Sequence, residues 1–364
     1  MNRLAFGLAL VSLPLVYQAA SRADDSTAPP AESPREHLQS SQLPWDRLDT
    51  LAVSGGGATL EEPPFYRVYD AVLDNANNVV FVVNGGDGEL IRYDIASGQM
   101  SRIGRRGSGP GEFWPQLVEP SGPDSLLVYD RGRARFSVIP RSGDPGRSFN
   151  LHLVGGRGRQ LVAMTRMGTR FWVAQSLGMP GELMRVDTPP GTKARDTAIV
   201  SEMTLGGGVS NTVTRVPHGE WERTADMTSF ETIRDFYAGW ATIASGGDRL
   251  FVATFAADSL EVSAYRVGDD VGGSSGYPVE LAGLSHRGLR QLYASREGSL
   301  WVVEKTDDST VLHVFGESGD TWARQGRLTF PGTARILDVS QDRVAFVHLD
   351  ELDQEILVVA RAAG

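Results

Sequence analysis

Short apolar runs, each followed by a polar turn and a second apolar run, recur along most of the chain. The first run of each pair is rich in Val, Phe, Trp and Leu, which is typical of strands buried on both faces. The turns carry Gly, Asp or Asn, which favour hairpins. Hairpins are predicted for NVVFVVNGGDGELIRYD, DSLLVYDRGRARFSVIP, TRFWVAQSLGMPGELMRVD, DRLFVATFAADSLEVSAYRV, GSLWVVEKTDDSTVLHVF and DRVAFVHLDELDQEILVVA.

The six hairpins are spaced almost evenly, at 46, 45, 79, 50 and 44 residues between Val80, Leu126, Phe171, Leu250, Leu300 and Val344. All but one of these intervals match the roughly 40–50 residues of a propeller blade. Further strand-like runs flank the hairpins, such as VYDAVLD (68–74) and SFNLHLV (148–154). No long segment shows the period of an amphipathic helix. The pattern therefore predicts an all-β fold: a six-bladed β-propeller with four antiparallel strands in each blade.

The two ends of the predicted propeller complement each other. The last repeat stops after its third strand, at ILVVARAAG, so that blade lacks an outer strand. A lone strand-like run, LDTLAV (48–53), precedes the first blade. We expect this N-terminal strand to complete the last blade and close the ring, because closure removes an exposed strand edge.

A glycine-rich stretch, IGRRGSGPGEFWPQL (103–117), lies between two predicted blades. A phosphate-binding loop needs a following helix, whose N-terminal amides point at the anion. Here Pro115 and a strand follow instead. We interpret the stretch as a chain reversal between blades and expect Phe113 and Trp114 to pack between them.

The same region carries a family resemblance. GRRGSGPGEF followed by SLLVYDRGRARFSVI resembles the NHL-type repeats, in which a GxGPGxF turn precedes a strand ending in an aspartate and a basic hairpin loop. The chain from about residue 48 is similar to exported bacterial six-bladed propellers of this kind. The motif is well formed in one repeat only, so the resemblance supports the fold more than an activity. NHL-type propellers include scaffolds, ligand-binding modules and a few lyases.

The N-terminus predicts export to the periplasm or the medium. Arg3 precedes an apolar run, LAFGLALVSLPLV, and small residues then allow cleavage after Ala23. We expect residues 1–23 to be a signal peptide, 24–44 a flexible linker and 45–364 the propeller. The apolar run is too short to span a bilayer comfortably, and no membrane span is expected after cleavage.

Composition narrows the chemistry. The chain has 364 residues, no cysteine and a net charge of −10. These features exclude disulfides and thiolate nucleophiles and disfavour binding to nucleic acid. No GxSxG stretch is present and the histidines lack ligand spacing, so we predict no cofactor and no metal. We expect a monomer.

The predicted binding site lies where the inner strands begin, around the mouth of the axial tunnel on the loop face. The candidate ligand-binding residues are Arg67, Gln116, Arg159, Trp240, Arg290 and Arg335. Four arginines converging on one axis predict a small anionic ligand, held by charge-assisted hydrogen bonds. The alternative is that they point sideways and pair with acidic hairpin loops.

A long insertion at about 205–236 is expected on the same face, as a lid over the tunnel mouth. The candidate lid residues are His218, Glu220 and Trp221. His218-x-Glu220 could bind a metal or act as an acid–base pair, but it lacks a second histidine nearby. Asp70, Glu119 and Asp338 are the other carboxylates that could supply a metal site in the tunnel.

Two functions remain open from the sequence. The favoured hypothesis is an exported, non-catalytic propeller that binds a ligand or a protein partner on its loop face. The alternative is a propeller enzyme, a lyase or a metal-dependent hydrolase, acting at the tunnel mouth. Three or more oxygens converging in the tunnel would favour the enzyme, whereas arginines and aromatic residues would favour anion binding.

Overall fold

The regular structure of the chain is almost entirely β-strand, with one short 3-10 helix, η2 (Arg131–Arg133), in the part that the structure describes. No helix in this part is long and apolar enough to cross a membrane. The computed structural model describes residues 47–55, 65–104, 106–109, 111–143, 146–150, 160–176, 187–224, 230–232, 241–256, 259–267, 276–281, 284, 289–295, 298–306, 308–318, 321–332, 334–350 and 353–363.

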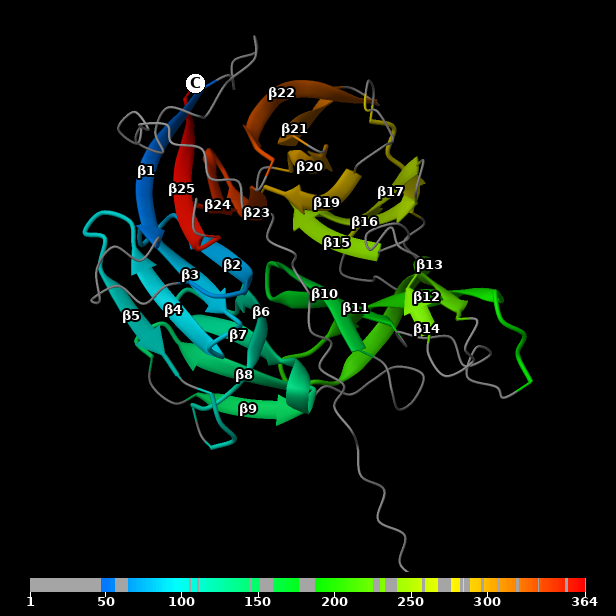
Figure 1. The fold of residues 1–364 in the computed structure, drawn as a ribbon, viewed down its shortest axis with the longest axis horizontal. Coiled ribbons are helices and arrows are strands. Elements are labelled where there is room, and N and C mark those ends of the chain that lie inside the picture. The colour runs from blue at the N-terminus through cyan, green and yellow to red at the C-terminus, as the bar shows by residue number, and fades with distance from the viewer. Residues whose placement is uncertain are drawn as a thin grey trace, which may run out of the picture. The chain divides into compact units, whose positions relative to one another are not determined.

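Six antiparallel sheets are arranged around a common centre (Figure 1). The innermost strands of blades 1 to 6 are β2 (Val68–Asp74), β6 (Pro115–Pro120), β10 (Gln160–Met167), β15 (Ala241–Gly246), β19 (Leu289–Ala294) and β23 (Arg335–Ser340). The second strands are β3 (Val79–Asn84), β7 (Ser125–Asp130), β11 (Arg170–Ser176), β16 (Arg249–Ala256), β20 (Leu300–Lys305) and β24 (Arg343–Leu349). Each inner strand contacts the inner strands of both neighbouring blades, so the sheets form a ring.

The outer half of each blade adds two further strands. The third strands are β4 (Glu89–Asp94), β8 (Arg135–Pro140), β12 (Lys193–Met203), β17 (Ser259–Arg266), β21 (Ser309–Ser318) and β25 (Glu355–Ala363). The fourth strands are β5 (Met100–Ile103), β9 (Arg147–Asn150), β13 (Val209–Arg223), β18 (Tyr277–Pro278), β22 (Thr321–Pro331) and, for blade 6, β1 (Arg47–Gly55). The predicted six-bladed β-propeller is confirmed.

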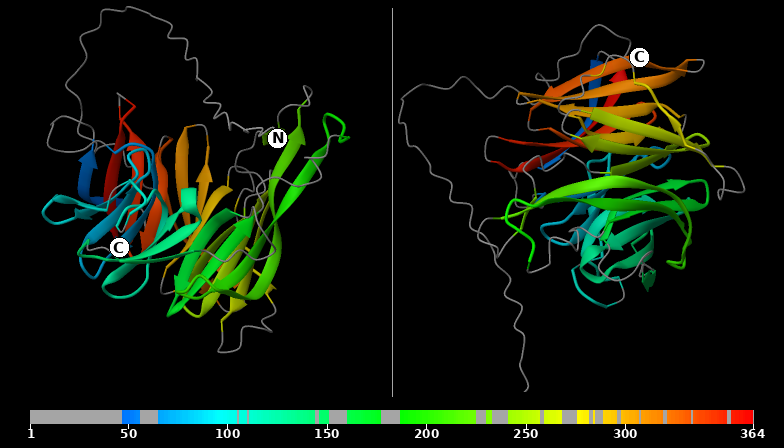
Figure 2. Two further views of the ribbon diagram at one scale, coloured as in Figure 1. Left: turned by 90° about the horizontal axis from the view of Figure 1, so that it is seen from below. Right: turned by 90° about the vertical axis from the view of Figure 1, so that its right-hand side faces the viewer.

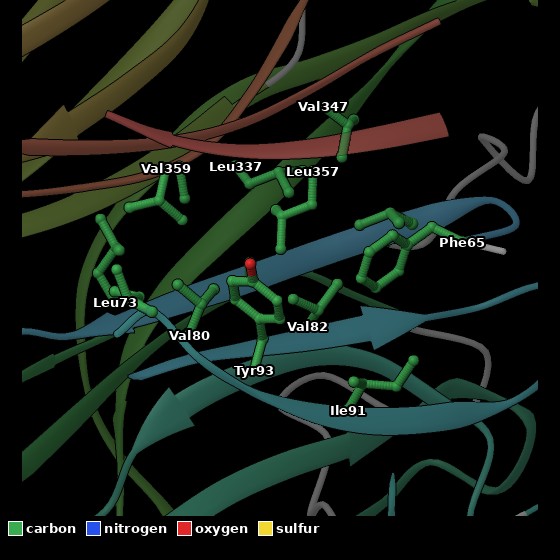
Figure 3. Close-up of a cluster of buried hydrophobic side chains, with 14 residues drawn as sticks. Phe65, Leu73, Val80, Val82, Ile91, Tyr93, Leu337, Val347, Leu357 and Val359 are labelled. Atoms are coloured by element: carbon green, nitrogen blue, oxygen red, sulfur yellow. The ribbon is translucent and has the colours of Figure 1, made fainter. Parts of the chain in front are cut away.

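The second strands are predominantly apolar because they are covered on both faces by neighbouring blades. Every residue of β3 is buried. Its side chains alternate between two cores: Val80 and Val82 pack toward blade 6, whereas Phe81 packs toward blade 2. Figure 3 shows the first of these cores, where Val80, Val82 and Tyr93 of blade 1 face Leu337, Val347, Leu357 and Val359 of blade 6.

The chain termini close the ring as expected. β1 pairs with β25 from Arg47↔Ala363 to Gly55↔Ile356, with one register shift. The two strands lie side by side at the blue and red ends of the colour scale (Figure 1). Leu48 and Leu51 pack against the cores on either side of blade 6. The first strand in the sequence is therefore the outer strand of the last blade.

Blade 3 differs from the prediction. Its third strand was expected within TRFWVAQSLGMPGELMRVD, but β11 pairs with β12, which begins only at Lys193. The segment predicted as an insertion, 205–236, instead contains the fourth strand, β13, and a fifth, β14 (Phe230–Thr232). Figure 2 shows the long β12–β13 hairpin, in green, extending beyond the neighbouring blades. The extra length of this repeat lies largely in its outer strands.

The glycine-rich stretch forms a self-contained turn. The Glu112 carboxylate accepts hydrogen bonds from the backbone N–H groups of Ser108 (3.0 Å) and Gly109 (2.8 Å). These amides, which a phosphate would need, therefore already hold an anion of the chain itself. Phe113 is buried between blades 1 and 2 as expected. The expectation for Trp114 is wrong, because 40% of this residue is exposed on the surface.

Removing residues 45–56 should open blade 6 and expose the edge of β25. We expect the melting temperature to fall by roughly 10 °C or more, or the protein to aggregate, because β1 is one of the four strands of blade 6 and Leu48, Leu51 and Ala52 pack against the neighbouring cores. Thermal unfolding followed by circular dichroism measures the change. A chain that begins at residue 45 is the matched control, and equal melting of the two proteins would contradict the prediction.

Candidate functional site

The axis of the propeller holds a cavity of about 940 Å³ that is lined by all six inner strands. The turns that follow β2, β6 and β10 also line it, through residues such as Asn77, Pro123 and Gly168. The cavity therefore extends toward the face where the inner strands end. The sequence analysis had placed the site on the opposite face, where these strands begin.

Strand register shows that the cavity wall contains two rings of equivalent side chains. Each residue of the first ring pairs with the equivalent position in the second strand of its own blade. The first ring consists of Asp70, Leu117, Ala163, Thr242, Gln291 and Arg335. The second ring consists of Val72, Glu119, Thr165, Ala244, Tyr293 and Asp338. All twelve residues line the cavity. The six-fold repeat thus brings Asp70, Glu119 and Asp338 to the axis.

Asp70 and Asp338 hydrogen bond to the inner strand of the next blade. The Asp70 Oδ2 atom accepts a bond from the Val118 N–H (2.8 Å), and the Asp338 Oδ2 atom accepts one from the Leu73 N–H (2.7 Å). The other oxygen of Asp338 accepts a bond from the Val339 N–H (2.8 Å). Both carboxyl groups therefore connect neighbouring blades at the axis.

Other polar side chains of the rings make comparable connections. The Tyr293 hydroxyl donates to the Ile336 carbonyl (3.0 Å), and the hydroxyls of Thr165 and Ser245 share a bond of 2.9 Å. Arg166, the residue directly after Thr165, donates to the Pro120 carbonyl (3.2 Å). Among the described residues, five of the six junctions between inner strands carry such a bond.

The cavity raises the pKa values of its acidic groups. Burial raises the pKa of the Asp70 carboxyl to about 7, although the Val118 and Ala71 N–H groups and the Arg335 charge oppose the shift. Burial, followed by the charges of Asp338 and Asp70, raises the pKa of the Glu119 carboxyl well above its ordinary value. These side chains touch the cavity but lie deep within the ring, so water stabilises their charged forms poorly. The ionised form of Glu119 is therefore disfavoured in the cavity.

The cations of the cavity wall have other partners. Arg335 donates to the Glu355 carboxylate (2.9 Å), and the other oxygen of Glu355 accepts from the Val68 N–H (2.7 Å). Arg166 donates to the carbonyls of Gly168 (2.7 Å) and Pro120. Arg141, at the rim, pairs with Asp74. Among the residues that the structure describes, three arginines and five acidic residues line the cavity, the acidic ones being Asp70, Asp74, Glu119, Asp124 and Asp338.

Of the three candidate ligand-binding residues whose side chains the structure describes, Arg67, Gln116 and Arg335, only Arg335 lines the cavity. Arg67 is exposed, and its guanidinium carbon lies 5.3 Å from the centre of the Tyr66 ring. Gln116 is the unpaired residue at a register shift of β6, and its buried Oε1 atom has no partner among the described residues. Arg290 occupies the equivalent place in β19, but its side chain lies outside the described residues, as do Arg159 and Trp240.

The candidate lid residues belong to β13, the fourth strand of blade 3. His218 is buried, and its Nδ1 atom accepts a hydrogen bond from the Ala241 N–H (3.0 Å) at the start of the next inner strand. Burial lowers the pKa of His218, and the Asp196 charge opposes this shift. Trp221 is half-buried, and the Glu220 side chain lies outside the described residues. Neither His218 nor Trp221 lines the cavity.

The three tunnel carboxylates named as a potential metal site do lie around one axis. Among the described residues, however, no group of three or more His, Asp or Glu side chains is arranged to hold a metal ion. One oxygen each of Asp70 and Asp338 is used instead in a bond between blades. Tyr293, Thr165 and Gln291 were not predicted as site residues, although a residue-by-residue alignment of the inner strands would have indicated them.

Comparison with known proteins supports the fold. No family model and no curated protein matches the chain. Among solved structures, a gluconolactonase from Xanthomonas campestris matches with a TM-score of 0.52 at 12% identity, covering 89% of this chain and 95% of that one. A luciferin-regenerating enzyme matches with a TM-score of 0.51 at 11% identity, covering 86% and 96%.

The chain is a six-bladed β-propeller. At these low identities the likeness extends to the fold alone. The NHL-type resemblance agrees with this architecture, since the GxGPGxF turn precedes an inner strand and the basic loop Arg131–Arg133 follows the second strand of the same blade.

Asp70 should make stability depend on pH. Its carboxyl keeps a proton in the folded state up to a pH near 7 but loses it near 4 when unfolded, so the folded state binds an extra proton between these values. Stability should therefore fall as the pH rises through this window. Asp70→Asn should flatten the slope of unfolding free energy by up to about 1.4 kcal/mol per pH unit.

Chemical denaturation at pH 5, 6, 7 and 8 measures this slope. Asp124→Asn removes an exposed carboxyl from the rim of the same cavity and is the matched control. His218, whose pKa depends on burial and on the Asp196 charge, contributes equally to all three proteins and cancels in the comparison, whereas part of the change in slope comes from Glu119, whose pKa the Asp70 charge also raises. Equal slopes for the wild type and Asp70→Asn would show that Asp70 ionises normally in the folded protein.

Proposed function

We propose that the protein is an exported binding protein that holds a small, positively charged polar ligand in the axial cavity. The observation that carries the proposal is the gathering of three carboxyl groups around a cavity of ligand size. Asp70 belongs to the first ring, and Glu119 and Asp338 belong to the second. The closest cations, Arg335 and Arg166, are bonded to Glu355 and to backbone carbonyls. Burial, followed by the charges of Asp338 and Asp70, raises the pKa of Glu119, and an ammonium group entering the cavity would oppose this shift by stabilising the ionised carboxylate.

The proposed binding keeps the ligand-binding class favoured by the sequence but reverses the charge of the ligand. The anionic prediction depended on four arginines, and the side chains of only two of them are described. One of these, Arg335, has a carboxylate partner at 2.9 Å. Anion binding stays a prediction, and the experiment below includes it.

Calorimetry with a defined panel tests the charge of the ligand. We use putrescine and spermidine as cations, glucose as a neutral polyol and gluconate as an anion. The polyamines should bind, and the double substitution Asp70→Asn/Glu119→Gln should weaken binding about tenfold or more, because it removes the groups that attract the cation. Asp124→Asn serves again as the control and should change affinity less than threefold.

Proton release gives a second, independent readout. At pH 6 the Asp70 carboxyl is mostly protonated, and a bound ammonium group would lower its pKa and displace the proton. The apparent binding heat should therefore depend on the ionisation enthalpy of the buffer, and this dependence should disappear in Asp70→Asn. Gluconate binding that Arg335→Gln abolishes, without polyamine binding, would overturn the proposal in favour of an anion site.

A second candidate function is proton-transfer catalysis in the same cavity. A carboxyl with a pKa of about 7 is suited to general acid–base catalysis at neutral pH, and Tyr293 lies in the adjacent ring. One similar structure is a gluconolactonase, so hydrolysis of glucono-δ-lactone is a sensible first assay. Hydrolysis that Asp70→Asn lowers at least a hundredfold, with unchanged melting, would establish the enzyme; hydrolysis no faster than buffer would exclude this substrate.

A further inference from the structure

A group of exposed aromatic and arginine side chains lies on the loop face at the junction of blades 1 and 2. Tyr66, Tyr69 and Trp114 are 52%, 45% and 40% exposed. The Trp114 Nε1–H donates to the Gly85 carbonyl (3.1 Å), which brings it to the β3–β4 turn that the tyrosines cover. We call Tyr66, Arg67, Tyr69, Arg106 and Trp114 the aromatic–arginine patch.

Two adjacent glycines seat the tyrosine rings on the backbone. A Cβ atom on Gly85 would lie 2.1 Å from the Tyr69 ring, and one on Gly86 would lie 2.1 Å from the Tyr66 ring. Any side chain at either position would displace a ring. The buried Asn84 side chain fixes the same turn by accepting from the Tyr66 N–H (2.7 Å) and donating to Asp87 (2.9 Å). The rings are therefore exposed but held in place.

The arginines of the patch are stacked on aromatic rings. The guanidinium carbon of Arg106 lies 4.1 Å from the centre of the Trp114 ring, and that of Arg67 lies 5.3 Å from the Tyr66 ring. Neither guanidinium has a carboxylate partner among the described residues. Stacking orients a guanidinium while leaving its N–H donors free, so both groups are prepared to bind carboxylates.

We propose that the aromatic–arginine patch binds an acidic segment of a partner protein. Tyr, Trp and Arg dominate the binding energy of protein interfaces, and side chains that are fixed beforehand lose little entropy on binding. The protein carries a net charge of −10, so an acidic partner is repelled by most of its surface. Two unpaired arginines would then direct such a partner to this patch and fix its orientation.

Fluorescence anisotropy tests the proposal with three labelled decapeptides: (Glu-Phe)5, (Gln-Phe)5 and (Lys-Phe)5. The glutamate peptide should bind most tightly and should lose affinity as salt rises. Arg67→Gln/Arg106→Gln should weaken its binding about tenfold or more, because each substitution removes a charge-assisted contact. The control Arg266→Gln/Arg324→Gln changes the net charge equally at exposed arginines of blades 4 and 5, and it should leave binding within about threefold.

Gly86→Ala provides a second test, because it displaces the Tyr66 ring without removing a charge. It should also weaken binding of the glutamate peptide. If this variant fails to fold, the result for the arginine pair decides the test. Equal effects of the patch pair and the control pair, or failure of the glutamate peptide to bind, would overturn the proposal. Patch-dependent binding of oligogalacturonate but not of the peptide would overturn the protein partner in favour of an acidic glycan. Tyr69 of the patch also lines the axial cavity, but Arg67 and Arg106 do not, so the arginine substitutions test the patch separately from the cavity ligand.

Discussion

The inner edge of each innermost strand faces the axis and has no neighbouring strand with which to pair. Its backbone N–H and C=O groups would be costly to leave unsatisfied so deep in the protein. Side chains of the adjacent blade meet part of this requirement: Asp70 and Asp338 accept N–H groups, and Tyr293 donates to a carbonyl. The polar character of the tunnel therefore follows from the ring itself. The raised pKa values follow in turn, because these acids are held where water is scarce.

Packing between blades determines the residue types in some parts of the molecule and leaves them free to vary in others. The second strands are apolar in every blade since each is covered twice, and their sequences vary little in character. The tunnel positions carry Val, Glu, Thr, Ala, Tyr and Asp in one ring. Blade-to-blade packing does not select so mixed a set. It is the part of the fold in which function can differ between propellers.

The sequence predicted the architecture well because its signals are local and repeated. Doubly buried strands, hairpin turns and the missing outer strand could all be recognised without distant contacts, and β1 beside β25 confirms the closure. The site was predicted poorly for a geometric reason. Register shifts in five inner strands displace the residues that follow them, so Gln116 and Arg335 do not occupy equivalent places. The prediction of the third strand in blade 3 was wrong because this strand begins only at Lys193, whereas β11 ends at Ser176. This separation is longer than the hairpin turn that the pattern of the other blades predicted.

The closure of blade 6 also has a consequence for biosynthesis. Strand β1 must wait for Glu355–Ala363, which are made about three hundred residues later, before its backbone can pair. The remaining blades can form in order as they emerge, since each is built from consecutive strands. The final step is a contact spanning about three hundred residues of sequence, and such distant pairings form slowly. Until then both ends remain open to chaperones, to proteases and to pairing with another copy of the chain.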